Sequence, residues 1–133
     1  MIVGVGRKYG SSCWPLQSEP AIALDNDAYY WFLRPLLERL DQETGQWIDL
    51  YGDARFAGDD LQGLERMLTA ADELVRSQPA TWQVHIGTQT YRGKHSEVYY
   101  TAHRARFQEL LTQWRQVVAR ARQMKRAVVC FGD

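Results

Sequence analysis

The sequence predicts an α/β or α+β fold in which a mixed or antiparallel sheet of four to six strands packs with three helices. Three segments carry apolar residues at helical spacing, and short apolar or alternating segments lie around them. The alternating segments favour a sheet with one packed and one partly open face, which is typical of antiparallel pairing. The chain has 133 residues, so we expect residues 1–133 to form a single domain.

The N-terminal part of the chain is predicted to supply two short extended segments joined by a loop. Residues 1–6, MIVGVG, form an apolar run typical of a strand. Residues 21–25 form either a second strand or an extended segment that leads into a helix. Residues 7–20, between them, have the Gly, Ser and Pro content of a loop.

A first helix is predicted from Asp27 to Glu43, because apolar residues recur at helical spacing after a cluster of good capping residues. Gly45 follows in the C-cap region. Pro35 lies inside the segment, and an interior proline removes one backbone hydrogen bond and kinks or breaks a helix. We expect one kinked helix, with a division into two shorter elements at Pro35 as the alternative.

The middle of the chain is predicted to run from a strand through a turn into a second helix. Residues 47–51 alternate in polarity as a strand does, and residues 52–58 resemble a turn. Either Gly58 or Asp59 is expected to cap the helix, and Asp59 has the spacing of a capping box. A clean apolar stripe then continues until shortly before Pro79.

The C-terminal part is predicted to contain a strand, a long helix and a final strand. Residues 81–87 alternate, which places Trp82 and His85 on opposite faces of a strand. Residues 88–100 are polar and form either a loop or a hairpin. A helical pattern rich in arginine follows, and residues 127–133 close the chain as a β run.

The composition predicts an ordinary soluble domain, with 45% apolar and 24% charged residues. No apolar run reaches the roughly 20 residues needed to cross a bilayer. The apolar N-terminal stretch is too short for a signal peptide and has no basic region before it. We therefore expect a cytoplasmic protein in which Cys13 and Cys130 are thiols rather than a disulfide.

Charge is distributed unevenly along a chain whose net charge is zero. Residues 19–73 contain thirteen acidic and four basic residues, whereas residues 76–126 contain ten basic and two acidic residues. Two interpretations stay open at this point. The two segments face and neutralise each other within the monomer, or one of them meets an oppositely charged partner.

The sequence contains no motif typical of a metal site or of a known catalytic nucleophile. His85, His95 and His103 form no close ligand pair, so we expect no bound metal and no cofactor. Cys130 is predicted to be a buried, inert strand residue, although a pairing with His85 would make it a nucleophile.

Two alternative functions follow from particular residues. In the first, the chain is a small enzyme of unrecognised class in which Asp49 and His85 form an acid and base pair on the open sheet face. In the second, the arginine-rich last helix contacts nucleic acid. We expect neither, because Asp53 fits a structural role in a turn, Asp59 and Asp60 fit the start of a helix, and the domain as a whole is neutral.

A partner-binding surface is the function that the residues favour. Aromatic side chains interleaved with polar groups are typical of the centres of protein interfaces, and acidic residues beside them would steer a basic partner. The candidate binding residues are Trp47, Asp49, Tyr51, Asp53, Asp59, Asp60 and His85.

The segments IDLYGDARFAGDDL, WQVHIGTQ and VVCFGD resemble those of small bacterial proteins of one domain. In size, compactness, acidic patches and lack of catalytic motifs the chain resembles immunity-type proteins of polymorphic toxin systems. The resemblance implies a non-enzymatic protein that binds a cognate toxin domain and masks its active site. Where the toxin is a nuclease, the acidic residues would stand in for phosphates.

Overall fold

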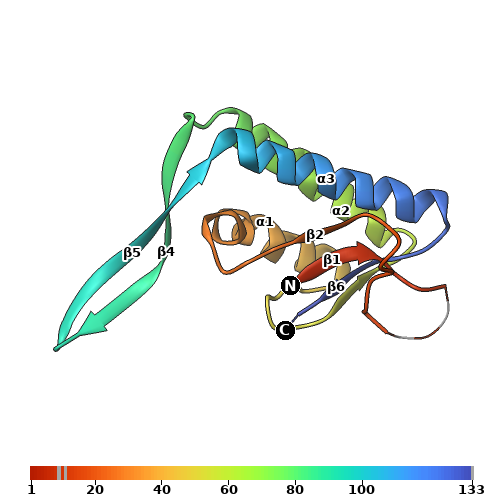
Figure 1. Ribbon diagram of the computed structural model, residues 1–133, viewed down its shortest axis with the longest axis horizontal. Coiled ribbons are helices and arrows are strands. Elements are labelled where there is room, and N and C mark those ends of the chain that lie inside the picture. The colour runs from red at the N-terminus through yellow and green to blue at the C-terminus, as the bar shows by residue number, and fades with distance from the viewer. Residues whose placement is uncertain (9, 11, 133) are drawn as a thin grey trace.

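The computed structural model describes residues 1–8, 10 and 12–132, and within them it shows an α+β fold with three helices and six strands (Figure 1). This confirms the predicted fold class. Tyr9 and Ser11, in the predicted loop at residues 7–20, lie outside the described residues. The elements are β1 (Ile2–Val5), β2 (Ala21–Ala23), α1 (Ala28–Thr44), β3 (Ala54–Phe56), α2 (Asp60–Arg76), β4 (Thr81–Tyr91), β5 (Lys94–His103), α3 (Arg104–Gln123) and β6 (Val128–Phe131).

The central sheet has four antiparallel strands in the order β2-β1-β6-β3. The first and last strands of the chain are therefore its two central strands, and Val3 pairs with Ile22 on one side and Cys130 on the other. Both termini lie beside this sheet in Figure 1. The predicted strands at both ends of the chain and at residues 21–25 are confirmed.

One face of this sheet packs against the helices, and the other is partly open, as predicted, with Ile2 38% exposed on it. Val3 and Val5 point toward the helices and are fully buried. On the opposite face a Cβ placed at Gly4 would lie 2.8 Å from the Cβ of Pro15, so the N-terminal loop closes tightly over this glycine. Trp14 of the same loop packs edge-on against Phe131 at 4.5 Å between ring centroids.

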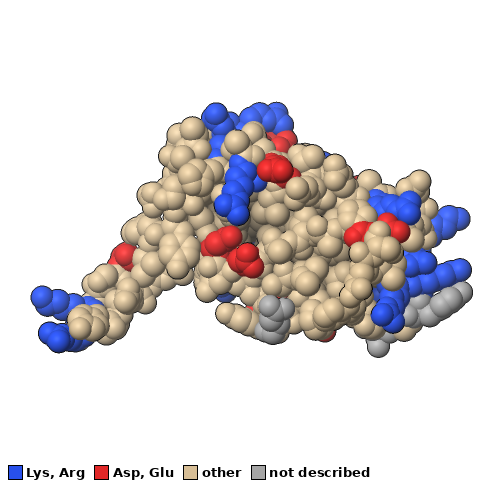
Figure 2. All heavy atoms as spheres, viewed as in Figure 1, with Lys and Arg blue, Asp and Glu red and all other residues tan. Residues whose placement is uncertain are grey.

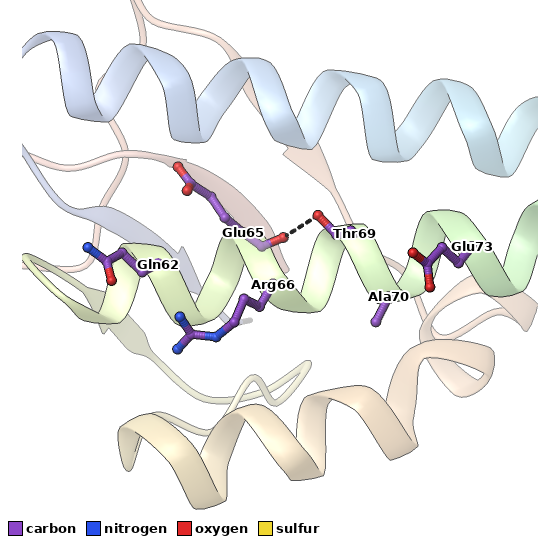
Figure 3. Close-up of a pocket in the computed structure, with 6 residues that line it drawn as sticks. All are labelled: Gln62, Glu65, Arg66, Thr69, Ala70 and Glu73. Atoms are coloured by element: carbon purple, nitrogen blue, oxygen red, sulfur yellow. Dashed lines mark hydrogen bonds between the residues drawn. The ribbon is translucent and has the colours of Figure 1, made fainter.

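The three helices form one layer over the sheet, with α2 between α1 and α3 (Figure 3). Their apolar stripes supply most of the core, as the helical spacing predicts. The largest side chains that this layer buries completely include Leu33, Leu64, Phe107 and Trp114. Among the described residues, the helices include none long and apolar enough to cross a membrane.

Helix α1 is one continuous helix with Pro35 in its interior, as expected. The side chain of Asp27 caps its start by accepting hydrogen bonds from the backbone N–H groups of Tyr29 and Tyr30, at 2.9 and 3.3 Å. Gly45 ends it in the left-handed region at φ 72°, and its N–H donates to the carbonyl of Asp41. Local capping chemistry therefore sets both ends of this helix.

The pKa of the Asp27 carboxyl is raised, because burial raises it more than the hydrogen bonds from the two backbone N–H groups lower it. A raised folded-state pKa means that ionised Asp27 costs stability at neutral pH, and that this cost disappears as pH falls below the unfolded value of 3.8. We expect Asp27→Asn, which keeps an acceptor without the charge, to be more stable than the parent at pH 7.

Urea denaturation across pH 3 to 7 measures this effect, and the advantage of the asparagine variant should shrink as pH falls. The control is Asp27→Ala, which loses the acceptor as well as the charge and should be less stable than Asp27→Asn by about 1 kcal/mol at every pH. An asparagine variant that is less stable at pH 7, with a gap that does not depend on pH, would show that the charge itself favours the fold.

The strand predicted at residues 47–51 is wrong, and the strand in this region is β3, inside the segment predicted as a turn. Ile48 and Leu50 are buried as the alternation requires, but their backbone has no neighbouring strand. The hydroxyl of Tyr30 donates instead to the carbonyl of Ile48 at 3.2 Å. The free edge of β6 pairs with Ala54–Phe56, so a long-range partner decides where the strand lies.

Helix α2 starts and ends close to the predicted residues, but its predicted side-chain cap does not form. Asp59 stands at the N-cap in a helical conformation and its carboxylate makes no capping hydrogen bond. The turn before it is satisfied by backbone groups, since Asp60 N–H donates to Ala57 and Leu61 N–H to Gly58. Asp59 is therefore the N-cap residue, as one of the two predicted alternatives has it, but the side-chain hydrogen bond of the predicted capping box is absent.

The polar segment at residues 88–100 forms a hairpin rather than a loop. Strands β4 and β5 make a separate two-stranded sheet whose turn has positive φ at Arg92 (49°) and Gly93 (75°), as in type I′ turns. The root of this hairpin packs against α1, through the buried Val84 and Ala102. The rest projects away from the body of the molecule (Figure 1).

Candidate partner-binding surface

The outer part of the hairpin, residues 85–100, is named the hairpin arm. Tyr91, Tyr99 and Tyr100 are 66%, 54% and 46% exposed, and they lie on both faces of the ribbon. Figure 2 shows that the outer end of the arm carries positive charge, which comes from Arg92 and Lys94 at the turn. The exposure of these side chains leaves most of the arm without a packing partner among the described residues. An isolated two-stranded hairpin is only marginally stable in water.

His85, one of the predicted binding residues, belongs to a polar cluster on the arm. Its Nε2 atom contacts the carboxylate of Glu97 across the two strands, and the hydroxyl of Thr88 lies 3.3 Å from both oxygens of that carboxylate. The ring of Tyr99 lies 5.3 Å from the imidazole. This cluster fixes the side chains of one face of the arm.

A hollow of about 530 Å³ lies where the root of the hairpin meets α1 and the end of α2. Trp82 lines it and is stacked 6.1 Å from Phe107, with Phe32 packed edge-on against both rings. The indole Nε1 of Trp82 is buried without an acceptor among the described residues. Trp31 and His85 lie on the same hollow.

The hollow continues into a strip of aromatic residues on α1 and the segment that follows it. The guanidinium of Arg34 lies 5.0 Å from the ring centre of Trp31 and 5.7 Å from that of Trp47. Cation–π contacts of this kind hold the three side chains together. We name the resulting surface the aromatic strip; its residues are Trp31, Arg34, Trp47, Trp82 and His85.

The structure therefore brings two predicted residues, Trp47 and His85, onto one continuous surface. Three others lie together in the turn before β3. Asp49 accepts from the N–H of Tyr51 at 3.0 Å, and Tyr51 is 73% exposed. Asp53 accepts from the N–H of Gly132 at 3.3 Å.

The remaining two predicted residues lie far from the aromatic strip. Asp59 and Asp60 are at the start of α2, whereas Leu74, near its end, lines the hollow beside the strip. A helix advances about 1.5 Å per residue, so Asp60 and Leu74 are about 20 Å apart. The predicted residues thus fall into three groups rather than one surface.

The alternative catalytic pair of Asp49 and His85 receives no geometric support. Asp49 caps a turn through its own backbone neighbour, while His85 contacts Glu97 on the hairpin. Cys130 is fully buried in the central sheet, and burial raises the pKa of its thiol. Cys130 is a free thiol, as predicted, and no group of potential ligands with metal-site geometry occurs among the described residues.

A further hollow on the outer surface of α2 has the character of an ordinary helix surface. Figure 3 shows that Gln62, Glu65, Arg66, Thr69, Ala70 and Glu73 all come from this single helix. Glu65 points toward α3 and Arg66 toward α1, where they contact Arg122 and Glu43 respectively. Their charged groups are engaged with the neighbouring helices.

The unequal charge of the two halves of the chain is partly neutralised within the monomer. Arg120 makes two hydrogen bonds to Glu19 at 2.6 and 3.1 Å, and this contact holds the pKa of the Glu19 carboxyl below its usual range. Arg122 contacts Glu65 at 2.5 Å. These pairs join the acidic and basic segments, but they leave the hairpin turn and the end of α3 strongly positive.

Comparison with protein-family models, with curated proteins and with solved structures gives no match. The candidate surface therefore rests on its own geometry. Reasoning from the sequence missed Trp31 and Arg34, which are ordinary members of a helical pattern, and it missed the tyrosines of the arm. The adjacent pair Tyr99-Tyr100 in a polar segment was the available signal, because neighbouring strand residues point to opposite faces.

Proposed function

We propose that this chain is a non-enzymatic protein-binding domain that engages its partner through the hairpin arm and the adjoining aromatic strip. The projecting arm with three exposed tyrosines is the observation that carries this proposal. Tyrosine, tryptophan and arginine are the residues most enriched at the energetic centres of protein interfaces. The arm and the strip supply all three types.

The arrangement of these residues favours a partner that contacts both the arm and the body of the domain. The aromatic strip passes from Trp47 on the body to His85 at the base of the arm, so the two surfaces meet at an inner corner. A convex partner that fills this corner would bury Trp31 and Trp82 from both sides. It would also give the marginally stable hairpin a surface to pack on.

The partner class that we propose to test first is a cognate bacterial toxin domain, as the resemblance to immunity-type proteins implies. The charge of the arm adds a condition on this partner. Arg92 and Lys94 would approach an acidic part of its surface, and the acidic residues Asp49 and Asp53 lie on another part of the domain.

The test is to co-express the chain with the protein encoded beside it and to measure binding of the purified pair by calorimetry. We expect a 1:1 complex that Tyr99→Ala and Trp31→Ala each weaken by about tenfold or more. Tyr51→Ala is the matched control, since Tyr51 is an exposed tyrosine outside the arm and the strip. It should leave the affinity within about twofold.

Two results would overturn the proposal. A complex that forms with unchanged affinity in both the Tyr99→Ala and Trp31→Ala variants would exclude the arm and the strip. A larger loss of affinity in the Tyr51→Ala variant than in the Tyr99→Ala variant would show that the interface includes the turn before β3 instead. Circular dichroism of each variant separates a loss of binding from a loss of folding.

A further inference from the structure

A second surface at the opposite end of the molecule gathers positive charge from three distant parts of the sequence. It is a hollow of about 350 Å³ between the loop after β1, the start of α2 and the end of α3. In Figure 2 Lys and Arg side chains gather at this end of the molecule. We name it the basic hollow; its charged residues are Arg7, Lys8, Arg55, Arg122, Lys125 and Arg126.

The dipole of helix α3 accounts for only part of this charge. Cations near a helix C-terminus are favourable, which explains Arg122, Lys125 and Arg126 without any ligand. Arg7 and Arg55 come from the loop after β1 and from β3, and the helix dipole gives no reason for them to line the same hollow. Like charges brought together in this way destabilise the fold unless an anion neutralises them.

Two of the cationic side chains at the hollow interact with acidic residues outside its lining. Glu65 contacts Arg122, and Glu19 lies close enough to Arg126 for that guanidinium to lower the pKa of its carboxyl. Glu19 is already engaged by Arg120 in two hydrogen bonds. Among the described residues the lining of the hollow contains six cationic side chains and no acidic one, so its wall carries a positive potential.

Lys125 stands in a backbone conformation that favours glycine. Helix α3 ends in a Schellman motif, with Lys125 N–H donating to the carbonyl of Arg122 and Arg126 N–H to that of Ala121. The residue at this position has φ 53°, where glycine is the usual choice and a side chain adds strain. Lys125 places an ammonium group on the hollow, and the helix end is less stable than it would be with glycine at this position.

Arg55 supplies an unused donor beside the hollow. Its Nη1 atom is buried and has no hydrogen-bond acceptor among the described residues. A Cβ placed at Gly6 would lie 3.5 Å from this atom, so the absence of a side chain there leaves room for the guanidinium. A buried guanidinium donor without an acceptor is costly, and an anion in the hollow would offer one.

We propose that the basic hollow binds a small anion with at least two linked phosphate groups. Three observations support this proposal: the cationic side chains that line the hollow, the strained backbone of Lys125 and the buried Arg55 donor without an acceptor. Arginine and lysine are the residues that bind phosphate oxygens, arginine through its planar fork. A single carboxylate would neutralise one charge of six, whereas a diphosphate brings several charges and fits a hollow of about 350 Å³. Neither the hairpin arm nor the aromatic strip takes part in this site.

The test uses inorganic pyrophosphate as the probe in calorimetry on the full chain at about 20 mM salt. We expect one site per chain, with inorganic phosphate bound at least about tenfold more weakly because it offers fewer charges. Lys125→Gly should weaken pyrophosphate binding by about three- to tenfold. The same variant should melt at a higher temperature than the parent when no anion is present, because glycine relieves the strain at φ 53°.

Arg115→Gln is the matched control, because Arg115 is an exposed arginine of α3 outside the basic hollow. It should leave the affinity for pyrophosphate within about twofold. An equal loss of pyrophosphate affinity in the Arg115→Gln and Lys125→Gly variants would show general charge attraction, and the proposed site would be wrong. Absence of pyrophosphate binding, or binding of a single-stranded RNA oligonucleotide with no binding of pyrophosphate, would overturn it as well.

Discussion

Replacing Phe107 with alanine is expected to lower the free energy of unfolding by about 3–5 kcal/mol, the largest effect of any single substitution considered for this chain. Phe107 is fully buried on α3, and its ring lies 4.9 Å from that of Tyr29, 5.4 Å from Phe32 and 6.1 Å from Trp82. The substitution leaves a cavity among three aromatic rings that cannot collapse without moving α1 or β4. Urea denaturation followed by tryptophan fluorescence measures the loss.

The position of Phe107 also predicts where the variant loosens first. Trp82 is at the root of the hairpin, so we expect amide protons of β4 and β5 near that root to exchange faster in the variant than in the parent. Amide protons of β1 and β6 should exchange only through global unfolding, so their rates should change only as far as the total stability changes. Thr112→Ala, on the exposed side of the same helix, is the control and should change stability by less than about 0.5 kcal/mol. A loss below about 1 kcal/mol from Phe107→Ala would show that the aromatic cluster repacks freely.

Replacing Gly132 with alanine is expected to cost about 1–3 kcal/mol, because the end of the chain packs against the backbone of the turn before β3. A Cβ at position 132 would lie 2.3 Å from the backbone N of Gly52 and 2.5 Å from the carbonyl carbon of Tyr51. Backbone atoms cannot rotate away as a flexible side chain would. The C-terminal segment must therefore shift, and the hydrogen bond from Gly132 N–H to Asp53 is lost with it.

Asp53→Ala separates the two parts of this effect. It removes the hydrogen bond without adding any atom, so it should cost less than Gly132→Ala, about 1 kcal/mol at most. Thermal unfolding of both variants gives the comparison. Equal stability of Gly132→Ala and the parent would mean that the end of the chain is free to move away from the turn at no cost.

The parts of this fold that follow from neighbouring residues could be predicted from the sequence. Asp27 and Gly45 delimit α1 because a side-chain acceptor and a left-handed glycine act within one helical turn. The strand at residues 47–51 could not be predicted correctly, because Ile48 and Leu50 alternate in burial without having a strand beside them. Whether an alternating segment becomes a strand depends on an edge formed by residues far along the chain.

The candidate surfaces were harder to predict because they combine residues from distant positions. His85 and Trp47 share a surface only because Arg34 and Trp31 of α1 lie between them. The expectation was that both lie on the open face of one sheet, but Trp47 lies outside the strands and His85 belongs to the separate β4–β5 hairpin. The basic hollow joins residues near positions 7, 55 and 125, which a one-dimensional charge pattern does not bring together.

The place of β6 in the sheet has a consequence for how the molecule forms. Since β6 is synthesised after β1 and β3 and lies between them, the sheet has a gap at its centre until this segment has been made. The helices and the β4–β5 hairpin need only local contacts and can form earlier. During that interval Val3 and Val5 lack their central neighbour, so the apolar edge of β1 is open to pairing with other chains until β6 covers it.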